Sequence, residues 1–171
     1  MPAIAEFAPA AIATEVLGAV AAGEMVLSAG WHEDGGEPLT PTTIAARADD
    51  GWKLTGTRIC VPAGAIADAV LVPAAIEGGS VGLFLVRIDA EGVGVEPLRT
   101  TLGDPQAAIL MAMTPAQLVA EGHESLRWAY ERAVATQCAM AVGVLARALE
   151  LTAEYTKERK QFDVPIASFQ A

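Results

Sequence analysis

The chain has 171 residues, of which 53% are hydrophobic and only 5% aromatic. This composition excludes an intrinsically disordered protein and favours a domain of closely packed small side chains. Eleven basic against 21 acidic residues give a formal net charge of −10, which excludes nucleic-acid binding driven by counterion release. The two cysteines, Cys60 and Cys138, lie far apart, and residues 1–7 lack the basic start of a signal peptide. We therefore expect a cytoplasmic protein with both thiols reduced.

Residues 1–23 are rich in alanine and carry apolar residues at near-helical spacing, which predicts a short helix. From residue 24 the pattern changes to short strand-like runs separated by Gly, Pro and Asp. Asp49, Asp50 and Gly51 separate two of these runs, and Asp-Gly supplies the positive φ of a tight hairpin turn. Short strands at this spacing predict an antiparallel β-barrel or sandwich. The expected strands are residues 24–29, 43–48, 52–57, 69–72, 81–88, 93–97 and 109–113.

A helical period begins after Pro115, and residues 121–162 contain no proline. Residues 133–146 are apolar on all sides, as is typical of a helix buried among other helices. This run is shorter than the roughly 20 apolar residues of a membrane span, so no membrane span is expected. Pro165 ends the helix, and residues 165–170 resemble the first turn of another. The sequence thus predicts an α+β chain, a β-barrel or sandwich followed by a long α-helix. Its partner helices belong to another chain or to a longer protein.

The strongest local motif is at residues 155–170, which read YTKERKQFDVPIASFQ. This segment closely resembles the signature of the acyl-CoA dehydrogenase family that closes the first helix of its C-terminal bundle. Residues 51–58 (GWKLTGTR), 66–72 (IADAVLV) and 92–98 (GVGVEPL) are similar to the middle β-domain of the same family. The resemblance divides the chain into three parts. Residues 1–23 correspond to the end of an N-terminal helical domain, 24–118 to the β-barrel domain, and 119–171 to the start of a C-terminal helical domain.

The resemblance implies α,β-dehydrogenation of an acyl-CoA thioester by FAD in lipid metabolism, within a homo- or hetero-oligomer that passes electrons to an acceptor. In the family, the Arg and Phe of an R-x-x-F motif reach the FAD of a neighbouring subunit, and Arg159 and Phe162 match those positions. Gln161 matches a position that often hydrogen-bonds the same cofactor. A guanidinium can fork onto pyrophosphate oxygens, and an aromatic ring can pack against adenine. Spacing alone favours Arg159 as a cation at a helix C-terminus and Phe162 as a core residue, and the resemblance favours the cofactor contact instead.

The β-domain departs from the family pattern. Leu27 and Ser28 match the first-strand positions whose amides and hydroxyl contact the flavin, but the Glu-Pro that follows in the family is lost. Three carboxylates within residues 32–37 would repel phosphate groups and suit a solvent-facing loop. The Trp that stacks on the flavin is replaced by Cys60. Pro62 offers neither the hydroxyl nor the N–H that the family supplies. These departures predict weak flavin binding by this β-domain.

No residue is expected to act as the catalytic base. A minority of the family carry a glutamate on this helix, and counting back from Arg159 places that position at Ala133. Glu131 lies two residues away, about 200° around the helix, so we interpret it as a solvated carboxylate. His32, without a second histidine, indicates a polar turn and no metal site. Cys138, within the apolar run, is expected to be a small core residue.

Three functions are consistent with this pattern. The chain is a part or subunit of an acyl-CoA dehydrogenase-like flavoprotein. Alternatively, it is a non-catalytic accessory subunit that completes a partner's FAD site through Arg159 and Phe162. The third possibility is an inactive domain fragment. The sequence identifies neither the acyl chain nor the electron acceptor.

Overall fold

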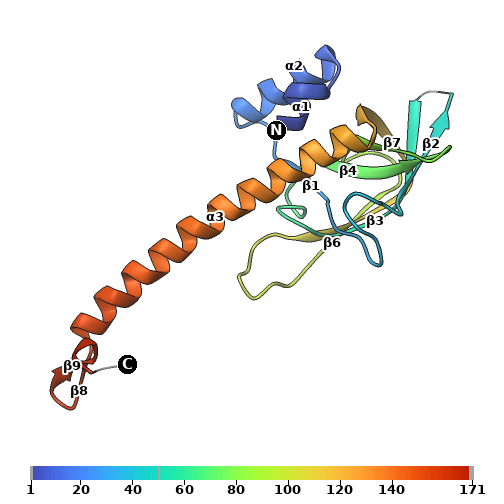
Figure 1. Ribbon diagram of the computed structural model, residues 1–171. Coiled ribbons are helices and arrows are strands. Elements are labelled where there is room, and N and C mark those ends of the chain that lie inside the picture. Colours follow the sequence, from blue (N-terminus) through green and yellow to red (C-terminus); the bar gives the residue numbers. More distant parts are fainter. Residues whose placement is uncertain (1, 50, 170–171) are drawn as a thin grey trace. The chain divides into compact units, whose positions relative to one another are not determined.

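Two compact units, Met1–Tyr130 and Glu131–Ala171, make up the computed structural model, which describes residues 2–49 and 51–169. The first unit holds two short helices, seven strands and the start of a long helix (Figure 1). The second unit holds the rest of that helix and a small hairpin. The helices are α1 (Pro2–Phe7), α2 (Ala10–Ala21) and α3 (His123–Glu158). The strands of the first unit are β1 (Leu27–Ala29), β2 (Ile44–Ala48), β3 (Gly51–Val61), β4 (Ala69–Ile76), β5 (Ser80–Arg87), β6 (Val93–Pro97) and β7 (Ala107–Glu121).

Five of these strands close into a barrel. The hydrogen-bonded order runs β4-β2-β3-β7-β5, and β5 pairs back onto β4. Strand β1 extends the sheet beside β4, and β6 lies beside β7. The predicted barrel followed by a long helix is confirmed. Most strand pairs are antiparallel, as predicted, but β1 and β2 both pair with β4 in parallel, at opposite ends of that strand.

The predicted hairpin is confirmed by its strand pairing, and Asp50 of its turn lies outside the described residues. Strands β2 and β3 pair antiparallel, with Ala48 opposite Gly51 as the last pair before the turn. Gly51 has a φ of 136°, a conformation that an L side chain rarely adopts and that glycine adopts freely. The turn therefore sets the register of the barrel's first antiparallel pair.

Strand β7 is much longer than expected, because it continues from Ala107 to Glu121 rather than ending at residue 113. Pro115 suggested the end of a strand, since proline donates no hydrogen bond to a ladder. The strand passes this point through an irregularity in its pairing with β3, beside Met113, whose φ is 54°. It then leaves β3 and pairs with β5 from Gln117 to Glu121, which closes the barrel.

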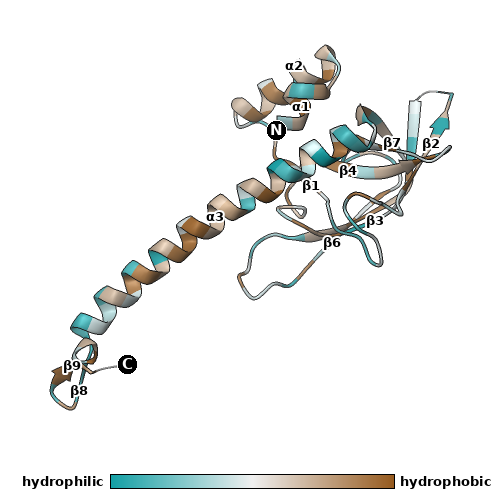
Figure 2. Cartoon of the chain, in the orientation of Figure 1, coloured by the Kyte–Doolittle hydropathy of each residue, from teal (hydrophilic) through white to brown (hydrophobic). Residues whose placement is uncertain are grey.

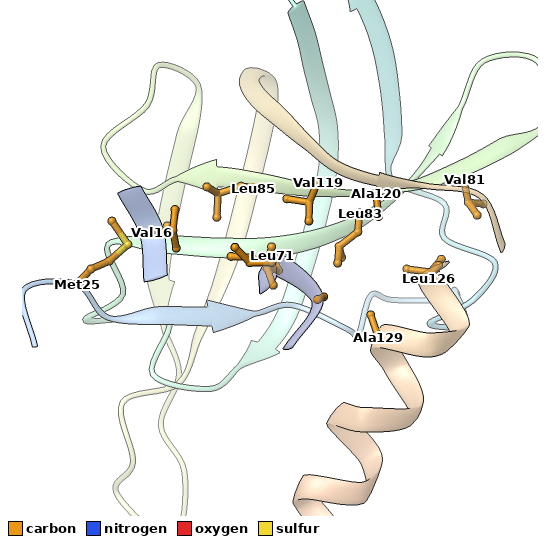
Figure 3. Close-up of a cluster of buried hydrophobic side chains, with 13 residues drawn as sticks. Val16, Met25, Leu71, Val81, Leu83, Leu85, Val119, Ala120, Leu126 and Ala129 are labelled. Carbon is orange, nitrogen blue, oxygen red and sulfur yellow. The ribbon is translucent and has the colours of Figure 1, made fainter. Parts of the chain in front are cut away.

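Residues 2–21 form two helices rather than the one short helix expected, because Pro9 stands between α1 and α2 at the N-cap of the second. Both helices pack on one of two buried clusters of the first unit. Figure 3 shows this cluster between β4, β5, β7, α2 and the start of α3. Its members include Val16 of α2 and Leu126 of α3, each about 1% exposed. The start of α3 is thus anchored on the outer face of the barrel.

The second cluster fills the barrel itself. Strand β4 serves both clusters, because Ala69 and Leu71 belong to the outer one and Val70 and Val72 to the inner one. This alternation is the period of two that places successive side chains on opposite faces of a strand. Both faces of β4 are therefore dry, which explains its nearly continuous apolar sequence.

In the second unit, α3 is apolar and exposed. Figure 2 colours much of this part of the helix as hydrophobic, and Val142, Leu145 and Leu149 are each about 70% exposed. By length and composition alone α3 could cross a membrane, since an 18-residue stretch has a mean hydropathy of 1.4. The apolar run of residues 133–146, on which the expectation of no membrane span was based, is shorter than this 18-residue stretch. A helix from the core of a soluble protein passes the same criterion.

Helix α3 begins at His123, with Glu124 in its first turn as expected for the helix dipole, and ends at Glu158. The predicted continuation to Phe162 is wrong. After Arg159 the chain forms a small hairpin of β8 (Lys160–Gln161) and β9 (Val164–Pro165). A single 3₁₀ turn, η1 (Ile166–Ser168), follows where the start of another helix was predicted.

Candidate functional site

The two β-domain segments predicted to face a flavin lie side by side. Ser28, in β1, donates a hydrogen bond from its hydroxyl to the carbonyl oxygen of Pro62, just after β3. Leu27 and Ser28 are half-buried, and β1 pairs in parallel with β4 through Leu27 opposite Ala69. The hydroxyl of Ser28 is thus already occupied by a partner within the chain.

A β-bulge presents Cys60 at the same place. The pairing of β3 with β7 shifts register between Arg58 and Val61, and Cys60 within this shift has a φ of 51°. A bulge of this kind redirects a side chain out of the regular alternation. The Cys60 side chain is exposed, and Ala63 beyond it also has a positive φ, 53°. A short thiol therefore stands at the position where an aromatic ring would offer a flat face.

Beneath this segment lies a buried ion pair that the sequence did not indicate. Arg58 is fully buried, and its Nη2 lies 3.2 Å from Oε2 of Glu33, which is 7% exposed. Glu33 also accepts hydrogen bonds from the backbone N–H groups of Thr42 and Thr43 and from the Thr43 hydroxyl, the last at 2.8 Å. Nη2 of Arg58 donates to the carbonyl of Pro73. Glu33 was expected on a solvent-facing loop, and that expectation is wrong for this carboxylate, though Asp34 and Glu37 are exposed.

Burial and pairing act against each other on these charges. Burial alone raises the pKa of Glu33, but the hydrogen bonds from Thr42 and Thr43 and the charge of Arg58 outweigh it, so the pKa lies below its ordinary value. Burial lowers the pKa of Arg58 to about 10, while the charge of Glu33 opposes the shift. Both groups are therefore charged at neutral pH, and each depends on the other.

Close packing around the pair fixes the neighbouring backbone. A Cβ added at Gly30 would lie 2.9 Å from the Cβ of Arg58, and one at Gly36 would overlap the side chain of Glu33. His32, expected in a polar turn, forms an isolated bridge to Ile59, whose N–H donates to the His32 carbonyl at 2.9 Å. The ion pair thus connects the loop after β1 to β3, close to the bulge.

The second candidate site is the terminal hairpin. Phe162 and Asp163 form its turn, with φ of 51° and 65°, between the short strands β8 and β9. The N–H of Ile166 donates to the carbonyl of Arg159 at 2.8 Å, which ties the returning chain to the end of α3. The ring of Phe162 is 90% exposed. The hairpin therefore presents an aromatic ring to solvent on a defined backbone.

All three residues of the predicted flavin contact lie on this hairpin or at its base. They were expected on the helix, but α3 ends before Arg159, and Phe162 lies in the turn rather than in a core. Among the residues that the structure describes, no hydrogen bond or ion pair engages the guanidinium of Arg159. The Gln161 amide donates only to the neighbouring carbonyl of Lys160. A ligand can therefore reach the guanidinium of Arg159, the amide of Gln161 and the ring of Phe162.

On α3, Glu131 and Ala133 are separated around the helix axis by the angle expected for two positions of an α-helix. Glu131 is exposed, and Ala133 lies about 200° further around the helix, so Glu131 does not occupy the position at which a minority of the family carry their base. Cys138 is exposed on α3, so the expectation that it is a core residue is wrong within this chain.

The comparisons with known proteins agree with this geometry. The family described as acyl-CoA dehydrogenase, C-terminal domain, matches residues 109–171. The acyl-CoA dehydrogenase FadE27 of Mycobacterium tuberculosis is 42% identical over 129 residues, 74% of this chain and 34% of that protein. The chain belongs to the acyl-CoA dehydrogenase family. It spans about a third of the length of this curated relative.

Solved structures of the family superpose on nearly the whole chain. The ChsE4-ChsE5 complex from Mycobacterium tuberculosis matches with a TM-score of 0.89 and 32% identity, over 98% of this chain and 46% of that one. A glutaryl-CoA dehydrogenase from Mycobacterium smegmatis in complex with FADH2 matches with a TM-score of 0.85 and 25% identity, over the same shares. The barrel and α3 are therefore the middle-domain fold and a helix of the acyl-CoA dehydrogenase family.

The flavin that this family uses can be tested against the two sites. The face formed by Ser28, Cys60 and Pro62 fits it poorly, because the hydroxyl is engaged, the aromatic ring is missing and proline has no N–H. The terminal hairpin fits part of the cofactor, since Arg159 is free to bind pyrophosphate oxygens and Phe162 offers an exposed ring. The terminal hairpin therefore carries groups that suit part of a flavin cofactor, whereas the barrel face carries few groups that do.

Proposed function

We propose that this chain belongs to an acyl-CoA dehydrogenase-like assembly in which its terminal hairpin completes the FAD site of a neighbouring chain. FAD, when bound, accepts the hydride lost as an acyl-CoA thioester is oxidised to its α,β-unsaturated form. The observation that carries the proposal is the exposed ring of Phe162, held in a left-handed turn three positions after Arg159, whose guanidinium has no partner among the described residues. A solvent-exposed aromatic ring in such a backbone conformation is stabilised when a partner covers it.

In this proposal each residue of the hairpin has a binding role. Arg159 would bind phosphate oxygens of the cofactor through its guanidinium, and the amide of Gln161 would supply a further hydrogen bond. Phe162 packs on the adenine and keeps water from the contact. No proton-abstracting role is assigned to α3, because Glu131 is displaced from the position of a base and Ala133 has no ionisable group.

The hydrogen bond from Ser28 to the carbonyl of Pro62 argues against a second candidate function, that of a subunit with a complete flavin site of its own.

The ChsE4-ChsE5 complex, a solved structure similar to this chain, supports an assembly with acyl-CoA dehydrogenase-like partners. We propose that the substrate of the whole assembly is an acyl-CoA thioester and that a separate electron acceptor reoxidises its flavin.

The proposal predicts that Arg159→Ala weakens FAD binding by the assembled complex by about tenfold or more. A hydrogen bond to a charged group contributes about 1.5–3 kcal/mol, and this one would be lost. The measurement is the FAD retained by the purified assembly after dilution. Lys157→Ala is the matched control, because Lys157 is an exposed cation in the last turn of α3 and has no place in the contact. Unchanged FAD retention in Arg159→Ala would refute the contact.

A second prediction concerns the barrel face. Cys60→Trp combined with Pro62→Thr restores an aromatic face, a hydroxyl and a backbone N–H beside Ser28, and we expect the chain to gain measurable FAD binding. The readout is the change in FAD fluorescence on titration with the full chain. Leu102→Trp places a new aromatic residue at an 86% exposed position away from this face and serves as the control. If the double substitution binds no more FAD than the control, the loss of these groups does not explain the poor fit.

A further inference from the structure

The ring of Phe162 has one aromatic neighbour within the hairpin unit. Phe162 and Phe169 meet edge to face, with ring centroids 6.3 Å apart and planes at 82°. The Phe169 ring comes from beyond η1, seven positions later in the chain. It is itself 50% exposed, so it does not serve a buried core of this unit. The aromatic contact of Phe169 is with Phe162, the residue whose ring is proposed to pack on FAD.

Few backbone hydrogen bonds hold the hairpin of β8 and β9 in its conformation. Strands β8 and β9 pair through two residues each, and an isolated hairpin of this size is at best marginally stable. Phe162 and Asp163 are both left-handed, a conformation that costs free energy in residues other than glycine. The bond from the Ile166 N–H to the Arg159 carbonyl returns the chain to the base of the hairpin, and η1 then carries Phe169 back toward the turn.

We propose that Phe169 is a positioning residue, which holds the ring of Phe162 in the orientation that contacts FAD on the neighbouring chain. This role rests on the proposed function and adds a residue to it. The edge of one ring against the face of the other restricts the rotation of the Phe162 side chain. Because the side chain is ordered before the cofactor arrives, less conformational entropy is lost on binding.

The test uses the assembled complex and measures the rate at which FAD dissociates after dilution. Phe169→Leu keeps an apolar side chain but removes the ring, and FAD is expected to dissociate about 2- to 10-fold faster. Phe169→Tyr keeps the ring edge and is expected to dissociate at the wild-type rate. The melting temperature of the FAD-free assembly is expected to be the same for all three proteins, because neither ring is buried in the core of the hairpin unit.

A double substitution separates positioning from direct contact. If Phe169 acts through Phe162, then Phe162→Leu with Phe169→Leu loses FAD no faster than Phe162→Leu alone. An additive loss, a wild-type rate in Phe169→Leu, or no rescue by Phe169→Tyr would each overturn the positioning role. The proposed function fails separately, if both Arg159→Ala and Phe162→Leu retain FAD at the wild-type rate. Faster loss in those two variants with a wild-type rate in Phe169→Leu overturns only the role of Phe169.

Discussion

Replacing Glu33 with alanine is expected to lower the free energy of unfolding of the full chain by about 3–5 kcal/mol. Arg58 would stay buried without its counter-ion, and its Nε and Nη1 already lack a hydrogen-bond partner among the described residues. Two backbone N–H groups that now bond to Glu33 would lose their acceptor as well. The measurement is the denaturant midpoint and slope of the chain. Glu37→Ala, an exposed acid on the same loop, is expected to change the free energy by no more than about 0.5 kcal/mol.

The same pair predicts a pH dependence with a definite sign. The pKa of Glu33 is lower in the folded chain than its ordinary value of 4.5. Its contribution is therefore fully present above that value and is lost as the pH falls through the lower, folded pKa. Glu33→Gln keeps the shape of the side chain but does not titrate, so its unfolding free energy is expected to fall less steeply in this acidic range. Parallel curves for the two proteins would show that Glu33 is not the group responsible.

Phe84→Ala is expected to destabilise the barrel by about 3–5 kcal/mol, because it opens a cavity in a fully closed interior. Phe84 is 0% exposed, and its ring meets that of Trp52 edge to face, with centroids 5.4 Å apart. Trp52 lies on β3, next to β2, so its fluorescence reports on the same part of the barrel. The expected result is an earlier unfolding midpoint with a shift of Trp52 emission toward that of exposed indole. Leu102→Ala, at an 86% exposed position, is the control and should behave as the wild type.

The barrel could be predicted from the sequence where local chemistry determines local structure. The Asp-Gly turn fixed the β2–β3 hairpin, and strand β6 matches its expected range of residues 93–97. The second half of β7 could not be predicted, because a bulge beside Met113 and a change of partner strand leave no period in the sequence. Parallel pairing with β4 was missed for a similar reason, since it joins segments that are distant in the chain.

The candidate sites were predicted unevenly. The motif identified Arg159, Gln161 and Phe162, and these residues do lie together, but the end of α3 was placed four residues too late. The left-handed turn at Phe162 and Asp163 has no glycine to signal it. Glu33 was assigned to solvent because it stands among exposed acids on a loop, and its partner Arg58 lies far along the chain, on β3. A buried ion pair between distant segments leaves no mark on local composition.

The barrel face and the terminal hairpin differ in how well they suit a flavin, and the barrel has a structural role in either case. The barrel has a well-packed interior and a buried ion pair, although the face at Cys60 and Pro62 offers little that suits a flavin. The exposed apolar surface of α3 would be covered by helices in an acyl-CoA dehydrogenase-like assembly. In the proposed assembly, the first unit keeps the barrel fold and the terminal hairpin of the second unit contacts the cofactor of a neighbouring chain.

The measurement that tests this account most directly is the number of FAD molecules per copy of this chain, in the isolated chain and in the assembly purified with its partners. Flavin absorbance gives the FAD, and quantitative amino-acid analysis of the separated subunits gives the copies. The account predicts that the isolated chain holds no FAD and that the assembly holds one FAD for each flavin-binding partner subunit. One FAD bound per copy of this chain in the absence of a partner would contradict it.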